Sequence, residues 1–158
     1  MPELRRVLTS AGFEDVRTYL QSGNVILSSD ASPTKLARKC KRQIADGFGL
    51  DVEVVVRTRN ELAQIVRRNP LAKVAVNPKR YQVTFLAAKL GAKALRELAE
   101  LATEQEELVA SGRELYAWHP DGVARSKLWA RLASRDLGVA ATSRNWTTVT
   151  KLLELADE

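Results

Sequence analysis

The chain has 158 residues, of which 45% are hydrophobic and 28% are charged, with a formal net charge of +6. This length suits one domain, or two small subdomains that share a core, and it allows roughly 70% of the unfolded surface to be buried. No apolar run approaches the ~20 residues that span a bilayer, and residues 1–15 contain no continuous apolar stretch typical of a secretory signal. We therefore expect a soluble, cytoplasmic protein with no membrane partner.

The cysteine content and the charge distribution limit the kinds of functional site that the chain can have. A single cysteine, Cys40, excludes an internal disulfide and a cysteine-rich metal site, and we expect a buried, inert thiol there. The net positive charge permits binding to phosphates or nucleic acid without requiring it. The C-terminal third is the basic end, because between Gly122 and Lys151 only Asp136 opposes six basic residues: Arg125, Lys127, Arg131, Arg135, Arg144 and Lys151.

Apolar spacing, caps and turn residues predict the elements of the first half. In order, these are a helix over 2–11 ended by Gly12, a hairpin of strands 16–21 and 24–29 that turns at Ser22-Gly23, a helix over 33–48 capped by Ser32, a strand over 51–58, and a helix capped by Thr58 or Asn60 that ends near Asn69. The segment 70–78 holds two prolines and follows neither a helical nor a strand period, so we place a boundary there between residues 1–69 and 79–158, which can still form one compact domain.

The second half is predicted in the same way. Its elements are a strand over 81–88, a helix over 92–103, a hairpin of strands 107–109 and 114–118 that turns at Ser111-Gly112, a helix over 126–137, and a last helix that Ser143 or Asn145 caps.

The order of these elements predicts an α+β fold. Helix, strand, strand, helix, strand is the order of a ferredoxin-like, or split βαβ, unit without its first strand. The second half repeats that order without its last strand and ends in two helices.

Three segments together resemble a known family: DVRTYLQSGNVILSS from Asp15, DGVARSKL from Asp121 and ATSRNWTTVTKLLELA from Ala141. They are similar, in order and spacing, to the bacterial proteins of domain of unknown function family 1697. The resemblance implies an α+β protein with ferredoxin-like organisation, and it implies no activity.

The chain departs from this family at its start. Family members begin upstream of the position of Met1, with an apolar strand and a loop of Arg-Gly-Ile-Asn-Val type. Since the first strand of a ferredoxin-like unit is central, its loss would leave neighbouring backbone groups unpaired. The resemblance therefore predicts either that Met1 is internal to the natural protein or that this variant is weakly stable.

Several common sites are absent from the sequence. His119 is the single histidine, and beside Pro120 it is expected in a surface turn. Without further His or Cys ligands it cannot form a common zinc site, and no glycine-flanked nucleophile accompanies it. Glu106 and Glu107 are expected to be solvated, and no nucleotide-binding glycine motif occurs. We expect no metal or cofactor, and no catalytic residue is identified.

The segment from Gly122 predicts an anion site. Arg125 and Lys127 flank Ser126 at a predicted helix start, where free backbone N–H groups favour anions. The alternative is that Ser126 only caps the helix and that both cations are solvated.

The start of the last helix has a similar composition. Arg144 lies beside the expected cap Asn145, although a cation at a helix N-terminus opposes the macrodipole. Thr147 and Lys151 can share a face with Arg144. Trp146 is expected to pack in the core, with base stacking as the alternative.

These patterns favour a module that binds a phosphate-bearing or other anionic ligand, with nucleotide or RNA among the options. The expected ligand-binding residues are Arg125, Ser126, Lys127, Arg144, Asn145, Thr147 and Lys151. Asn24 is a further candidate ligand-binding residue. One alternative is an enzyme for a small anionic substrate, to which Asn24 or a residue of the upstream loop contributes, and another is a structural or oligomerisation domain.

Overall fold

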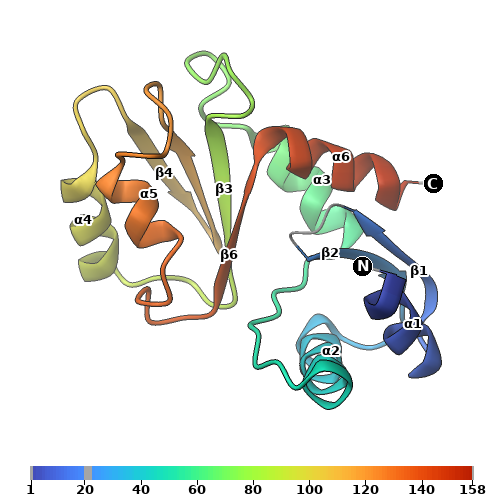
Figure 1. The fold of residues 1–158 in the computed structure, drawn as a ribbon. Helices are drawn as coiled ribbons and strands as arrows, with labels where there is room; N and C mark the ends of the chain where they lie inside the picture. Colours follow the sequence, from blue (N-terminus) through green and yellow to red (C-terminus); the bar gives the residue numbers. More distant parts are fainter. Residues whose placement is uncertain (1, 20–22, 158) are drawn as a thin grey trace.

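The computed structural model describes residues 2–19 and 23–157. These residues form a mixed α+β fold with two antiparallel sheets and six helices, which confirms the predicted α+β class. Figure 1 shows a two-stranded sheet with helices α1 and α2 in one part of the molecule and a four-stranded sheet in the other. Within the described ranges, none of the helices has the length and apolar character needed to cross a membrane.

The first part contains α1 (Pro2–Ser10), β1 (Glu14–Tyr19), β2 (Asn24–Ser28) and α2 (Pro33–Phe48). The predicted helix ends are confirmed: Gly12 has a left-handed φ of 98°, and the Ser32 side chain accepts a hydrogen bond from the backbone N–H of Lys35. Strands β1 and β2 pair antiparallel, with Tyr19 opposite Asn24. Ser22 of the predicted turn lies outside the described residues.

The strand predicted over 51–58 is wrong. Its valines favour an extended chain, but a strand also needs a hydrogen-bonded neighbour, and this segment joins no sheet in the described structure. The side chain of Arg57 holds the segment instead. Its Nη2 donates to the carbonyl oxygens of Leu86 at 2.7 Å and Arg113 at 3.0 Å, and its Nε donates to Glu114 at 3.0 Å.

The second part contains α3 (Arg59–Arg68), β3 (Tyr81–Leu86), α4 (Ala92–Leu101), β4 (Glu107–Ser111), β5 (Glu114–Trp118), α5 (Lys127–Leu132), β6 (Ala141–Asn145) and α6 (Trp146–Ala156). Its strands pair antiparallel in the order β4-β5-β3-β6. Strand β6 is not predicted from the sequence. It completes the order strand, helix, strand, strand, helix, strand, so the expectation that the second half lacks its last strand is wrong.

The two faces of the four-stranded sheet support different helices. Tyr81, Val83 and Phe85 alternate toward the core beneath α3 and α6, while Leu86 and Leu115 pack with α4 and α5. Because Arg144 of β6 pairs with Val83, the Arg144 side chain lies on the α3 and α6 face. Ser143 pairs with Thr84 on the opposite face, where their hydroxyls are 2.7 Å apart.

Helix α3 packs with the second part, although it precedes the expected boundary at 70–78. Leu62 and Ile65 belong to the same buried cluster as Tyr81 and Tyr116, and the Tyr116 hydroxyl donates to the Ile65 carbonyl at 2.9 Å. The first part has a smaller cluster of its own, whose buried members are Leu8, Val16 and Cys40.

Candidate functional site

Ser126 lies at the start of α5, and its hydroxyl both accepts and donates hydrogen bonds within the protein. Its hydroxyl accepts from the backbone N–H of Trp129 at 3.0 Å, as predicted for an N-cap, and donates to Glu106 Oε2 at 2.6 Å. The same carboxylate oxygen lies 2.5 Å from His119 Nδ1. Arg125 and Lys127 on either side are exposed, and α5 has only six residues.

The side chains of His119 and Glu106 are not at the surface, so the expectations for these two residues are wrong, whereas Glu107 is exposed as expected. The His119 side chain is 0% exposed and that of Glu106 is 5% exposed. The backbone N–H of His119 donates to the Arg80 carbonyl at 3.0 Å, which continues the pairing of β5 with β3 and carries the ring inward. Trp129 packs edge-on against the imidazole at 6.0 Å between ring centroids. His119 Nε2 has no hydrogen-bond partner within the described chain.

The electrostatics of this cluster favour an ionised Glu106. Burial alone would raise the pKa of Glu106, but hydrogen bonds from Ser126, His119 and the Thr103 backbone outweigh it and leave that pKa below its ordinary value. Ser126 and His119 both hydrogen-bond to the Glu106 carboxylate, and Ser126 Oγ also lies 3.4 Å from His119 Nδ1. The cluster therefore ties α5 to β5 and to the chain before β4.

Asn24 and Arg144, which lie 120 positions apart in the sequence, are brought together by the fold. Arg144 Nε donates to Asn24 Oδ1 at 2.7 Å, and Nη1 donates to the Thr142 hydroxyl at 2.6 Å and to the Ser143 carbonyl at 2.8 Å. Asn24 is 6% exposed. Burial lowers the pKa of Arg144, because a guanidinium loses hydration there. The hydrogen bond between Arg144 and Asn24 therefore joins the β1–β2 hairpin to the four-stranded sheet.

The remaining predicted residues surround the start of α6. Asn145 is the N-cap and accepts from the Thr148 N–H at 2.9 Å. Trp146 stacks on Tyr81 with ring centroids 4.8 Å apart, which confirms its packing role. Thr147 is exposed, and Lys151 Nζ lies 3.4 Å from Glu154 Oε1.

The predicted residues thus form two groups. Ser126 belongs with the helices on one face of the sheet, whereas Arg144 lies on the other face with the hairpin and α6. A single site between the two C-terminal helix starts, as the sequence suggests, is not the arrangement found.

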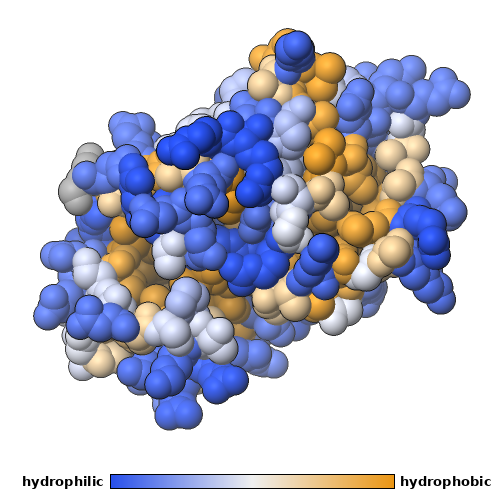
Figure 2. Space-filling view, turned by 180° about the vertical axis from the view of Figure 1, so that it is seen from behind, coloured by the Kyte–Doolittle hydropathy of each residue, from blue (hydrophilic) through white to orange (hydrophobic). Residues whose placement is uncertain are grey.

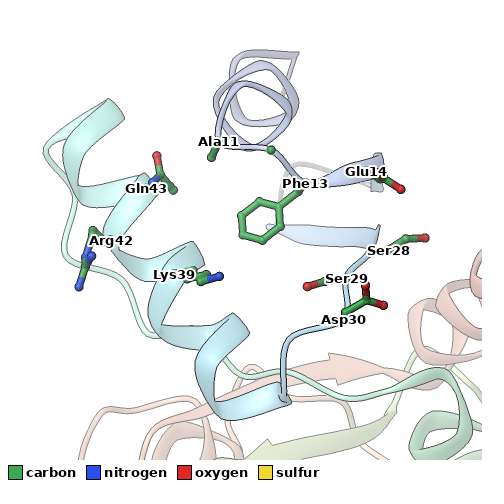
Figure 3. Close-up of a pocket in the computed structure, with 10 residues that line it drawn as sticks. Ala11, Phe13, Glu14, Ser28, Ser29, Asp30, Lys39, Arg42 and Gln43 are labelled. Atoms are coloured by element: carbon green, nitrogen blue, oxygen red, sulfur yellow. The ribbon is translucent and has the colours of Figure 1, made fainter.

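A pocket that the sequence does not predict lies beside α2. It has a volume of about 460 Å³ and is lined by residues 11–14 and 28–30 and by Lys39, Arg42 and Gln43. Figure 3 shows Phe13 projecting between the strand end and α2, with Lys39 on the helix wall and Asp30 across the opening. The spacing of three between Lys39 and Arg42 on a predicted helix is the signal that would have placed both on one wall.

Comparison with known proteins gives a fold and a family. The family model described as "Protein of unknown function (DUF1697)" matches residues 1–116. The structure is similar to that of the conserved bacterial protein SP0830 from Streptococcus pneumoniae, with a TM-score of 0.74 and 20% identity, over 99% of this chain and 88% of that chain. No curated protein is significantly similar to the chain.

Proposed function

Because the chain belongs to this family of proteins of unknown function, we propose a role from its own geometry: it binds a small anionic ligand, such as a phosphate ester, at the N-terminal end of α6. Arg144 and the first turn of α6 form the site, with Thr147 and Lys151 at its rim.

The observation that carries this proposal is the charge distribution along α6. Arg144 directly precedes the N-cap Asn145, and the first turn of the helix contains no acidic residue. Positive charge at a helix N-terminus opposes the macrodipole, so the Arg144 charge does not stabilise α6 itself, although its hydrogen bonds to Asn24, Thr142 and Ser143 join the hairpin to the sheet. At the other end Arg59 compensates Asp157 through a hydrogen bond of 2.5 Å. A bound anion would compensate the N-terminal end in the same way.

The surroundings of Arg144 support recognition of an anion. Burial has already removed part of the hydration of the guanidinium, so a ligand would displace less water there. Asn24 fixes the direction of the Nε–H bond, which reduces the entropy lost on binding. The backbone N–H groups of Trp146 and Thr148 on the first turn of α6 already donate to the Pro78 carbonyl and to Asn145 Oδ1, and the exposed Thr147 between them offers its hydroxyl toward solvent.

A thermal-shift series with phosphate, sugar phosphates, nucleotides and short RNA tests the proposal. A ligand at a hundred times its Kd adds about 2.7 kcal/mol to the stability of the native state. We expect one of these anions to raise the Tm of the wild type, Arg144→Ala to abolish the shift, and Arg144→Lys to weaken it. Arg125→Ala, which removes an exposed cation at α5, is the matched control and should leave the shift intact.

A second variant keeps the test clear if Arg144→Ala disturbs the fold. Thr147→Glu places a carboxylate on the exposed first turn of α6, so the protein supplies its own anion. We expect this variant to be more stable than the wild type without ligand and to gain nothing further from phosphate. If no anion shifts the wild type and Arg144→Ala merely destabilises it, Arg144 has a structural role and the proposal fails.

The pocket beside α2 is the second location to test for the same ligand class. Lys39 and Arg42 supply two cations on one wall, and a volume of about 460 Å³ falls within the range of small-molecule sites. If Lys39→Ala removes the thermal shift while Arg144→Ala preserves it, the ligand binds in this pocket instead.

A further inference from the structure

The loop that joins α3 to β3 projects beyond the end of the four-stranded sheet (Figure 1). It is nevertheless anchored. Leu71 is only 5% exposed and packs in the core, and its carbonyl accepts from the Ala75 N–H at 2.8 Å. The Tyr81 hydroxyl donates to Asn69 at 2.9 Å, and the Pro78 carbonyl accepts from the Trp146 N–H at 3.1 Å. The loop therefore presents its outer side chains on a fixed backbone.

Two of these outer side chains are aliphatic. Val76 is 80% exposed and Val74 is 40% exposed. Figure 2 shows apolar surface at the end of the molecule from which this loop projects, next to hydrophilic surface. Isolated exposed valines are ordinary, but here an anchored loop holds two of them outward together.

The same segment is strongly basic. Residues 67–80, which are the last two residues of α3 and the loop, contain five exposed cationic side chains and no acidic residue: Arg67, Arg68, Lys73, Lys79 and Arg80. Arg68 lies 3.5 Å from Glu114, and Arg80 donates to the Pro120 carbonyl. For Lys73 and Lys79 no ion pair occurs among the residues that the structure describes, so their charge faces solvent. Aliphatic and cationic groups thus share one projecting surface.

We propose that this basic-aliphatic loop, residues 67–80, docks on an anionic phospholipid surface. Val74 and Val76 enter the headgroup region, and Lys73 and Lys79 lie against the lipid phosphates. Binding of this kind combines buried apolar area with attraction to anionic lipid, and the loop offers both. It needs no spanning segment, so it agrees with the lack of long apolar runs even though the sequence alone predicts no membrane partner.

The chemistry of the loop favours lipid over other polyanions. A single-stranded nucleic acid stacks its bases on exposed aromatic rings, but Tyr81 is 1% exposed and Trp146 is stacked on it. A peptide partner usually lies in a groove, whereas this loop is a projection. An anionic phospholipid surface has an apolar layer beneath its charged phosphates. A projection with aliphatic and cationic side chains can contact both layers.

Vesicle co-sedimentation of the full chain tests the electrostatic part. We expect binding to phosphatidylcholine vesicles that contain phosphatidylglycerol, none to phosphatidylcholine alone, and weaker binding as salt rises. Lys73→Glu with Lys79→Glu should weaken binding at least about tenfold. The matched control is Lys93→Glu with Arg96→Glu, which makes the same charge change on exposed positions of α4 and should weaken binding much less.

The apolar part needs its own pair of variants. Val76→Ser should weaken vesicle binding without changing the net charge, whereas Leu50→Ser, at a position 54% exposed near the end of α2, should not. Arg144→Ala should leave vesicle binding unchanged, so this result is independent of the anion site at α6. Equal losses from both charge-reversal pairs, an unaffected Val76→Ser variant, or binding to poly(U) RNA without binding to vesicles would each overturn the proposal.

Discussion

Arg57 and Glu114 form an ion pair in the interior of the protein, with Arg57 Nε 3.0 Å from Glu114 Oε2 and side chains only 6% and 9% exposed. The guanidinium also lies over the Phe85 ring, 5.7 Å from its centroid. Burial lowers the pKa of Arg57 although Glu114 opposes that change. The pair fixes segment 51–58 to the start of β5, in place of strand hydrogen bonds, which the segment does not form with any described residue.

Removing one member of this pair should be strongly destabilising. Glu114→Ala leaves a buried guanidinium without its main counter-charge, which typically costs about 3–5 kcal/mol. The double variant Arg57→Met with Glu114→Leu removes both charges and should be more stable than Glu114→Ala alone. Urea unfolding of the single and double variants measures the difference, and a double variant less stable than the single one would contradict it.

The pKa of Glu106 predicts a dependence of stability on pH. Since the folded-state pKa lies below the ordinary value of 4.5, the ionised carboxylate stabilises the fold above that pH, and this contribution disappears as the pH falls through the folded pKa. Glu106→Gln should therefore destabilise the protein by roughly 1–3 kcal/mol at neutral pH. The gap to the wild type should close in acid. The exposed neighbour Glu104, changed to Gln, is the control, and urea unfolding across the acid range provides the measurement.

The N-cap of α6 offers a test that needs no ligand. Asn145→Ala loses the hydrogen bond from the Thr148 N–H and should cost about 1 kcal/mol. Asn145→Asp keeps the acceptor and adds negative charge beside Arg144, so we expect a Tm at or above that of the wild type. A lower Tm for the aspartate variant would show that the N-terminal end of α6 is not short of negative charge.

The contact between Asn24 and Arg144 should couple the hairpin to the sheet energetically. In a double-mutant cycle with Asn24→Ala and Arg144→Ala, we expect the two effects to be non-additive by about 0.5–3 kcal/mol, because both variants remove the same hydrogen bond. A cycle that pairs Asn24→Ala with Arg125→Ala should be additive. Additivity in both cycles would mean that the hydrogen bond contributes little.

Local signals explain which elements the sequence predicts well. The helix ends at Gly12, Ser32 and Thr58 depend on caps and turns within a few residues, and all three are found. Strand β6 has no such signal. Its sequence, ATSRN, shows no apolar alternation, and it becomes a strand because it pairs with β3, which lies far away in the sequence. Segment 51–58 shows the converse, since its residues favour a strand but pair with no strand in the part of the chain that the structure describes.

In the candidate site, too, the sequence predicts the features that depend on neighbouring residues and misses those that depend on tertiary contacts. The sequence identifies Asn145 and Ser126 as caps from their position before apolar helices. It does not place Arg144 against Asn24 rather than near Ser126, because the register of β6 decides which face of the sheet each side chain occupies. The burial of His119 likewise depends on Glu106, a tertiary contact without a local pattern.

The size of the cluster formed by Leu8, Val16 and Cys40 has a consequence for how the protein opens. The elements α1, β1, β2 and α2 depend on this small core, whereas the four-stranded sheet has a larger core on each face. Regions with few buried apolar contacts open at lower free energy than the global transition. Amide protons of β1 and β2 should therefore exchange with solvent through a subglobal opening. Those of β3 and β5 should exchange only through global unfolding.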